Sequence, residues 1–190
     1  IGVLDGVLLY YFPLNYGSEP VYSYTVAGAM ALLGENLFAL RLVNVMAGMA
    51  AIAMAYVWLS KAFNRRVAIV AAGLLALIFW PLASSREALR AGMLPLFMGG
   101  AVWFYWRLYT RGTAVARRQR WAWTVAFGFC VAVTLHIYLA SRVAWLLFPL
   151  FLGWLALTQR PKVRQMLTPT AAGLALAGLL VAPMFLYLRA

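Results

Sequence analysis

Ionisable side chains that could do chemistry are few in this chain, and they stand out against an apolar background. The carboxylates occupy four positions: Asp5, Glu19, Glu35 and Glu87. A carboxylate can act as a general base or bind a metal ion, and an arginine can bind phosphate oxygens with its planar fork of N–H groups. We therefore begin with the carboxylates, the single histidine and the few arginines that lie near them in the predicted topology.

Three arginines and the histidine suit recognition of an anionic group. Arg86 and Arg90 are four residues apart, so on a helical turn they point the same way. Arg142 could join them in one basic pocket. His136 is also a site candidate, because an ionisable residue within an apolar segment usually has a function. Phosphate recognition is the functional interpretation. The alternatives are ion pairing of these arginines with Glu87, Glu19 or lipid headgroups, and a neutral histidine hydrogen-bonded to a neighbouring helix.

Glu19 lies near the end of a loop-like stretch, residues 12–20, which contains Asn, Gly and two Pro. Pro20 suits the first turn of a helix, which places the Glu19 charge at a helix start, where it is favourable. One interpretation is a simple helix-capping acid at the membrane interface. The other is a carboxylate directed into a groove, where it binds a metal ion or a substrate group.

The elements that must position these residues are membrane helices. The chain is 66% hydrophobic and 11% charged, with apolar runs near the length that crosses a bilayer. Six strong spans are predicted: Leu42–Ser60, Val67–Ala83, Ala91–Trp106, Trp121–Ala140, Val143–Thr158 and Leu167–Leu188. A weaker helix is predicted over Pro20–Leu33. The fold class is therefore all-α, a polytopic bundle of about six to seven membrane helices, because only paired backbone is stable in lipid.

Charge in the connections predicts the orientation. Eleven of the sixteen basic residues fall in alternate loops, which the positive-inside rule assigns to the cytoplasm. They are Lys61, Arg65, Arg66, Arg107, Arg111, Arg117, Arg118, Arg120, Arg160, Lys162 and Arg164. All four carboxylates then lie on the opposite, outward face. Membrane headgroups account for the net charge of +12, so nucleic acid is not expected as a partner.

We expect residues 1–190 to form a single transmembrane domain, with an outward loop and weak helix at 10–33 and six membrane helices at 42–188. The chain begins at Ile1 within an apolar stretch, and we expect it to be incomplete at both ends. Small residues predict close helix packing, notably Gly173 and Ala177 on the last span.

Four short motifs carry a resemblance to a known family. They are NYGSEPVY at 15–22, LGENLFALRL at 33–42, FW at 79–80 followed by SR at 85–86, and HIY at 136–138 followed by Arg142. In order and spacing they resemble the GT-C class of membrane glycosyltransferases, in particular the glycosyltransferase family 39-like group of protein O-mannosyltransferases and aminoarabinose transferases of lipid A. The resemblance covers residues from about 10 to 155.

The resemblance implies a GT-C-like membrane fold and transfer of a sugar from a polyprenyl-phosphate-linked donor to an acceptor on the non-cytoplasmic face. It implies catalytic roles for Glu19 and Asp5, and a divalent metal ion, Mg or Mn, bound by Glu19. It implies that the leaving phosphate is bound by four residues: Arg86, Arg90, Arg142 and His136. Membrane lipids and other membrane proteins are the expected partners, and a bacterial inner membrane is the expected location.

One departure from the family pattern concerns the principal catalytic acid. Asp5 is the only candidate at the expected place, but Leu4-Asp5-Gly6 does not match the family's acidic motif. We therefore expect the principal acid to lie outside these 190 residues. The alternative function is a non-catalytic integral membrane subunit of a larger complex, built on a GT-C-like scaffold. A transporter or channel is a third hypothesis, against which stands the scarcity of polar residues in the spans.

Overall fold

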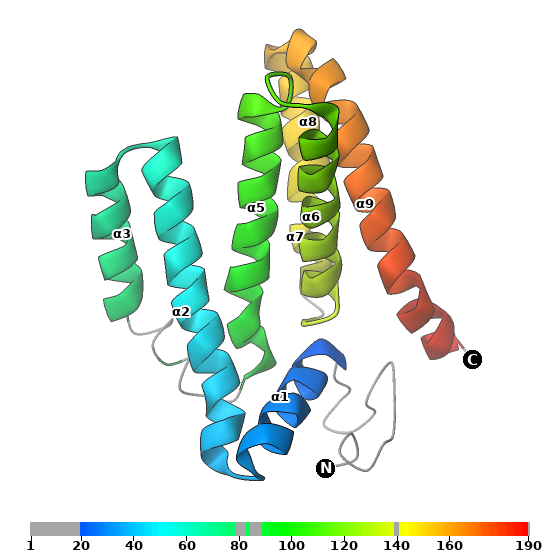
Figure 1. Ribbon diagram of the computed structural model, residues 1–190. Helices are drawn as coiled ribbons and strands as arrows, with labels where there is room; N and C mark the ends of the chain where they lie inside the picture. Colours follow the sequence, from blue (N-terminus) through cyan, green and yellow to red (C-terminus); the bar gives the residue numbers. More distant parts are fainter. Residues whose placement is uncertain (1–19, 79–82, 84–88, 139–140, 190) are drawn as a thin grey trace. The chain divides into compact units, whose positions relative to one another are not determined.

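The computed structural model describes residues 20–78, 83, 89–138 and 141–189, and the ordered secondary structure of these residues is entirely helical (Figure 1). The prediction of an all-α membrane fold is confirmed. The chain divides into two compact units, Ile1–Gly99 and Gly100–Ala190, which we describe in turn.

The first unit is built from α1, α2, α3 and the short 3-10 helix η1, and it contains the first residues of α5. Their bounds are Pro20–Leu33, Leu37–Ala62, Arg65–Leu77, Arg90–Met93 and, for α5, Leu94–Arg111. The weak helix predicted over Pro20–Leu33 is confirmed for these residues, and its end at Leu33 agrees with the prediction.

Local chemistry sets the two turns that flank α2. Gly34 adopts a positive φ of 84°, which ends α1, and the side chain of Asn36 accepts the N–H of Ala39 at 2.8 Å to begin α2. Asn64 begins α3 in the same way, accepting the N–H of Val67 at 2.9 Å. The Gly-x-Asn part of the 33–42 motif therefore has a structural role, the turn between α1 and α2.

Two polar contacts join η1 to the long helices of this unit. The fully buried Asn44 of α2 donates from Nδ2 to the carbonyl of Leu89 at 2.9 Å, and Thr25 of α1 contacts the sulfur of Met93 at 3.6 Å. Arg90 is thereby held beside the first half of α2. The basic turn between α2 and α3 lies at the other end of α2, as the predicted orientation requires.

The second unit contains the rest of α5 together with α6, α7, α8 and α9. The bounds are Arg117–Leu135, Ser141–Ala144, Leu147–Thr158 and Arg160–Arg189 for α6 to α9. Arg120 near the start of α6 donates to the carbonyl of Gln165 near the start of α9, and His136 after α6 meets Leu180 late in α9. These contacts show that α6 and α9 run parallel, as Figure 1 also shows.

Two glycines let α6 and α9 approach closely. A Cβ added to Gly128 would lie 2.5 Å from the carbonyl oxygen of Gly173, and one added to Gly173 would meet the ring of Phe127. Ala177, one turn further along α9, is 2% exposed. The predicted packing role of Gly173 and Ala177 is confirmed, and it follows the small-residue rule for membrane helices.

Aromatic side chains fill the space between α5, α6 and α8. The ring of Tyr105 lies 5.0 Å from those of Phe127 and Phe148, and Phe127 meets Phe148 edge-on at 4.7 Å. The Tyr105 hydroxyl lies 3.0 Å from Thr170 Oγ1, so the one polar group in this cluster is paired. This core packs α5, α6 and α8 together, and the pair of Tyr105 and Thr170 connects it to α9.

Among the described residues, three helical segments are long and apolar enough to cross a membrane: Leu37–Ala62, Ser141–Thr158 and Arg160–Met184. Several predicted boundaries differ. The last span begins at Arg160 rather than Leu167, so only Gln159 separates α8 from α9 and the basic residues there are helical. The fourth span begins at Arg117 and ends at Leu135, not Ala140. The second, α3, ends at Leu77, and the rest of that prediction falls largely on residues outside the described ranges.

Candidate functional site

One end of the second unit is organised by the turn between α6 and α7. The Ser141 hydroxyl lies 2.6 Å from the carbonyl oxygens of both Thr134 and Tyr138, and the Ser141 N–H also binds the Tyr138 carbonyl at 3.0 Å. Ser141 is 2% exposed, so these bonds are shielded from water. Arg142 is the next residue, and its backbone is therefore anchored to the end of α6.

His136 bridges this turn to α9. Its Nε2 lies 3.3 Å from the carbonyl oxygen of Leu180. A carbonyl only accepts, so this bond requires the proton on Nε2 and leaves Nδ1 as an acceptor in the neutral ring. Nδ1 is buried and has no hydrogen-bond partner among the described residues. The neutral ring can therefore accept one more bond, and only the protonated ring could donate one to a phosphate.

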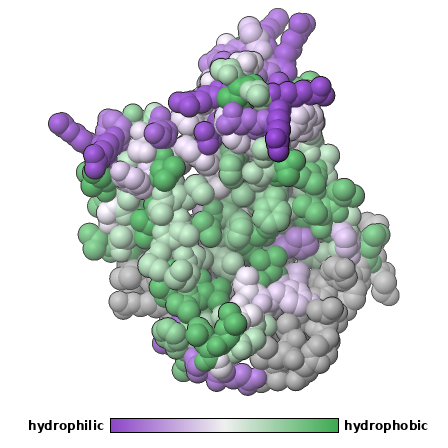
Figure 2. Space-filling view, in the orientation of Figure 1, coloured by the Kyte–Doolittle hydropathy of each residue, from purple (hydrophilic) through white to green (hydrophobic). Residues whose placement is uncertain are grey.

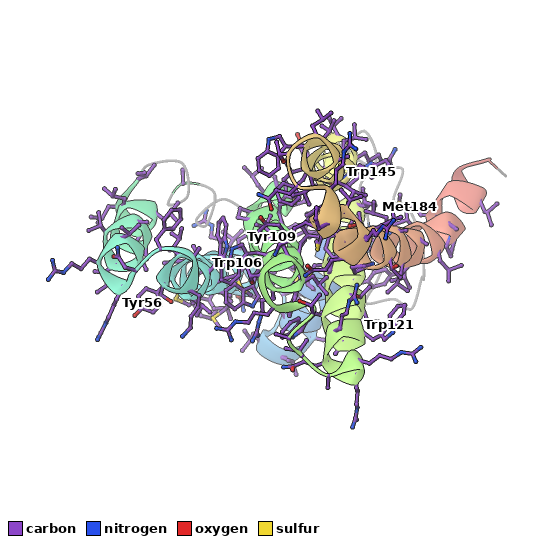
Figure 3. The ribbon with its side chains drawn as sticks, turned by 90° about the horizontal axis from the view of Figure 1, so that it is seen from above. Tyr56, Trp106, Tyr109, Trp121, Trp145 and Met184 are labelled. Atoms are coloured by element: carbon purple, nitrogen blue, oxygen red, sulfur yellow. The ribbon has the colours of Figure 1, made fainter. Side chains whose placement is uncertain are left out.

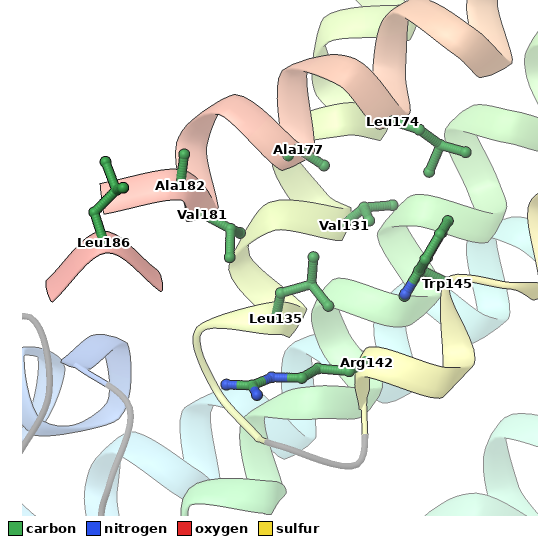
Figure 4. A pocket seen from close by; sticks show the side chains of 10 residues that line it. Val131, Leu135, Arg142, Trp145, Leu174, Ala177, Val181, Ala182 and Leu186 are labelled. Carbon is green, nitrogen blue, oxygen red and sulfur yellow. The ribbon is translucent and has the colours of Figure 1, made fainter. Parts of the chain in front are cut away.

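Arg142 lies at a largely apolar pocket between α6 and α9. The pocket has a volume of about 580 Å³ and is lined by Val131, Leu135, Arg142, Trp145 and six residues of α9 between 174 and 186. Figure 4 shows the guanidinium at one edge, beneath Leu135, with Val181 and Ala177 across from α6. The volume is within the range of roughly 300–1,000 Å³ that is typical of ligand sites. An apolar wall with one cation at its edge suits a hydrophobic molecule with an anionic group.

The other end of the same unit, which we call the basic end, carries eight cations. They are Arg107, Arg111, Arg117, Arg118, Arg120, Arg160, Lys162 and Arg164. Lys162 Nζ donates to the carbonyl of Tyr109 at 3.2 Å, and the Arg107 guanidinium stacks on Trp123 at 4.4 Å from the ring centre. Figure 2 shows hydrophilic side chains gathered over this end and a hydrophobic band below it, and Figure 3 shows Tyr109 and Trp121 there from above.

These contacts bear on the predicted topology. The α5–α6 and α8–α9 connections, both predicted to be cytoplasmic, meet at the basic end, while His136 and Arg142 lie at the opposite end. The third predicted cytoplasmic connection, with Lys61 and Arg65, belongs to the first unit.

The predicted site residues divide into three groups. Asp5, Glu19 and Arg86 lie outside the described residues, so their predicted roles remain predictions. Arg90 belongs to the first unit, on η1. His136 and Arg142 lie at the same end of the second unit, on either side of the α6–α7 turn, although only Arg142 lines the pocket there.

No metal centre is built by the described part of the chain, where no three His, Cys, Asp or Glu side chains lie together. Glu35, in the exposed turn before α2, is the only carboxylate there. The described residues therefore do not fit a divalent ion, and the predicted metal ligand Glu19 lies outside them.

Sequence reasoning missed two features of this site. The first is the anchoring role of Ser141, for which the only signal is its position directly before Arg142. The second is the apolar wall of α9, where Leu174, Gly178 and Val181 recur at helical spacing on one face. That spacing is also what packing alone would produce, so the wall could not be distinguished from core before the pocket was seen.

Comparison with known proteins identifies the chain. The profile of the dolichyl-phosphate-mannose-protein mannosyltransferase family matches residues 17–187. The chain belongs to this family. The match to this mannosyltransferase family confirms the resemblance to the GT-C class and, with the apolar helices, makes the chain an integral membrane protein of a glycosyltransferase type. No curated protein and no solved structure is significantly similar to the chain.

Proposed function

We propose that this chain is part of a membrane glycosyltransferase that takes a sugar from a polyprenyl-phosphate-linked donor and transfers it to an acceptor on the non-cytoplasmic face. The observation that carries the proposal is the pocket between α6 and α9. It has a volume of about 580 Å³, its wall is largely apolar, and the Arg142 guanidinium lies at its edge. A polyprenyl phosphate has the same two parts, a long apolar chain and an anionic head.

Arg142 is the residue that we assign to the donor phosphate. In the transfer, the acceptor nucleophile attacks the anomeric carbon, the bond from that carbon to the phosphate oxygen breaks, and negative charge accumulates on the leaving phosphate. A guanidinium placed in an apolar pocket stabilises that charge more than it would in water. Ser141 anchors the backbone beside Arg142, which limits the region that the guanidinium can reach.

His136 takes a conditional role in the proposal. With Nε2 bound to Leu180, the ring can assist the phosphate only as an imidazolium, through Nδ1. As the neutral ring it would accept a hydroxyl proton instead. The predicted roles of Glu19 and Asp5 as catalytic carboxylates, of Arg86 and Arg90 as further phosphate ligands, and of Mg or Mn held by Glu19 stay part of the proposal.

Binding of dolichyl-phosphate mannose to the purified protein tests the proposal directly. Arg142→Gln should weaken binding by at least about tenfold, because a hydrogen bond to a charged group contributes on the order of 1.5–3 kcal/mol. Arg118→Gln, at the basic end, is the matched control and should leave the affinity unchanged. Equal binding by Arg142→Gln and the wild type would reject the assigned role of Arg142.

The same experiment separates the enzyme from the non-catalytic subunit. An enzyme should lose mannosyl transfer in Arg142→Gln in parallel with binding, when the complete protein is used. A subunit that merely shares the scaffold should show neither binding of the donor nor transfer, and it should purify with a larger membrane complex.

A further inference from the structure

A second pocket lies at the basic end, between the first turns of α6 and the early turns of α9. It has a volume of about 270 Å³ and is lined by Arg117, Arg120, Trp121, Thr124, Thr168 and Pro169. It is separate from the Arg142 pocket, which lies at the other end of the same two helices. Two guanidinium groups, two threonines and one indole therefore face one small space.

Arg120 is held in place while most of its donors stay available. Its Nη2 donates to the carbonyl of Gln165 at 2.6 Å, which ties α6 to α9. A guanidinium has five N–H donors in a rigid plane, so one bond orients the group and leaves others for a ligand. Arg117 lies one turn earlier and is exposed. Arg120 is thus oriented by a hydrogen bond, whereas the Arg117 side chain is exposed and can adjust to a ligand.

Nothing within the second unit neutralises these cations. Residues 100–190 contain ten Lys and Arg and no Asp or Glu, so no acidic side chain of the unit can pair with Arg117 or Arg120. The neighbouring cations at the basic end add to the positive potential rather than reduce it. The natural occupant of the pocket is an anion.

The surroundings point to a lipid rather than a soluble anion. Trp121, Val125 and Phe129 follow one another at four-residue intervals on α6, and their side chains are 42%, 52% and 53% exposed. This apolar stripe begins at the pocket and runs toward the middle of α6. Trp is typical of the headgroup level of a bilayer, and an apolar stripe below it suits an acyl chain. The pocket can therefore hold a lipid headgroup, and the apolar stripe beside it can contact an acyl chain.

We propose that the pocket of Arg117, Arg120 and Trp121 is a specific site for an anionic phospholipid, with the phosphate held by the two guanidinium groups and an acyl chain lying along the α6 stripe. In the predicted orientation this site is on the cytoplasmic leaflet, where anionic lipids attract basic residues near the membrane surface. The site is independent of the donor pocket and of the proposed transfer reaction.

Lipid binding to the purified protein in neutral detergent tests the site. Phosphatidylglycerol should bind more tightly than phosphatidylcholine, and inorganic phosphate should neither compete with it nor stabilise the protein against heat. Arg117→Gln should lower the affinity for phosphatidylglycerol about tenfold, the effect expected when a direct hydrogen bond to a charged phosphate is lost. Arg120→Lys, which keeps the charge but loses the planar fork, should lower it by a smaller factor.

Arg118→Gln is the matched control, because Arg118 is exposed, adjoins Arg117 and does not line the pocket. It should change the affinity by less than about twofold. Trp121→Ala should weaken both lipids, because it removes chain contact rather than charge. Donor binding at the Arg142 pocket should stay at the wild-type level in all four variants.

Three outcomes would overturn the proposal: equal affinity for phosphatidylglycerol and phosphatidylcholine, equal losses in Arg117→Gln and Arg118→Gln, or stabilisation by inorganic phosphate matching that by the lipid. The first would show no anion selectivity, the second only diffuse surface charge, and the third a site for free phosphate. Because Arg117 is exposed, its replacement should not unfold the protein, and the unfolding temperature in pure detergent verifies this.

Discussion

The two ends of the α6–α9 pair are built from the same helices but differ in how charge is placed. At the basic end, eight cations gather around the end of α5 and the starts of α6 and α9, where Arg107 stacks on an aromatic ring and Arg120 and Lys162 donate to carbonyls. At the other end, Arg142 lies at an apolar pocket, with His136 hydrogen-bonded to α9 nearby. Many cations at a wet surface contribute little each, whereas one cation in an apolar pocket interacts strongly with an anion.

The difference explains why the two ends suit different partners. A broad basic surface attracts anionic headgroups without demanding one geometry, although the Arg117–Arg120 pocket adds selectivity within it. A single guanidinium against an apolar wall requires a ligand whose charge and apolar chain are correctly placed. The parallel course of α6 and α9 keeps these two environments apart at opposite ends of the unit.

Charge reversal at Arg142 should have the largest effect on this comparison. Arg142→Glu places an anion in the apolar pocket, where it repels the donor phosphate, so affinity for dolichyl-phosphate mannose should fall about a hundredfold or more. Binding of phosphatidylglycerol at the basic end should stay unchanged. Loss of both activities together would show that the two ends are not independent.

A larger residue at the closest contact between α6 and α9 should destabilise the whole second unit. Gly128→Ala sets a Cβ 2.5 Å from the Gly173 carbonyl and should lower the free energy of unfolding by about 1–3 kcal/mol. Gly153→Ala is the matched control, because its Cβ would meet no atom within 4 Å and helix propensity should then raise stability slightly. Denaturant unfolding in mixed micelles measures both, and the same sign for the two variants would contradict the packing account.

Removal of the Ser141 hydroxyl should affect only the Arg142 end. Ser141→Ala loses the bond to the Thr134 carbonyl and should weaken donor binding by about fivefold, in line with roughly 1 kcal/mol for a buried hydrogen bond. Ser141→Thr keeps a hydroxyl and should restore most of the affinity. If Ser141→Ala lowers the unfolding temperature without changing donor affinity, Ser141 is structural and does not position Arg142.

The smallest effect is expected outside the second unit. Asn36→Ala removes the cap of α2 and should cost about 0.5–1 kcal/mol of stability, with lipid and donor affinities unchanged. Asn36→Asp retains a capping oxygen and should be close to the wild type. A change in donor affinity in Asn36→Ala would link the first unit to the Arg142 pocket.

The sequence predicted the helices better than their ends. The end of α1 at Leu33 was predicted correctly, and Gly34 sets it through a local backbone preference, its positive φ. The end of α6 at Leu135 was missed because the hydroxyl of Ser141 captures the Thr134 carbonyl, a contact that hydropathy does not register. The start of α9 at Arg160 was missed for the opposite reason, since basic residues suit an interfacial helix turn as well as a loop.

The candidate site was predicted only in part. Arg142 and His136 could be chosen as candidate site residues from the sequence, because ionisable residues within or beside apolar segments are rare. The pocket walls were not predicted, since the apolar residues of α9 look the same whether they pack against a helix or face a ligand. Asp5, Glu19 and Arg86 lie outside the described residues, and their roles remain predictions.

The absence of Asp and Glu from residues 100–190 affects how the second unit responds to acidic pH. Acid unfolding proceeds largely through protonation of paired carboxylates, and this unit has no acidic side chain to protonate. Protonation of side-chain carboxylates therefore cannot change the charge of the basic end from within the unit. Attachment of the basic end to a bilayer should therefore persist in mildly acidic surroundings and weaken only when the lipid phosphates themselves lose their charge.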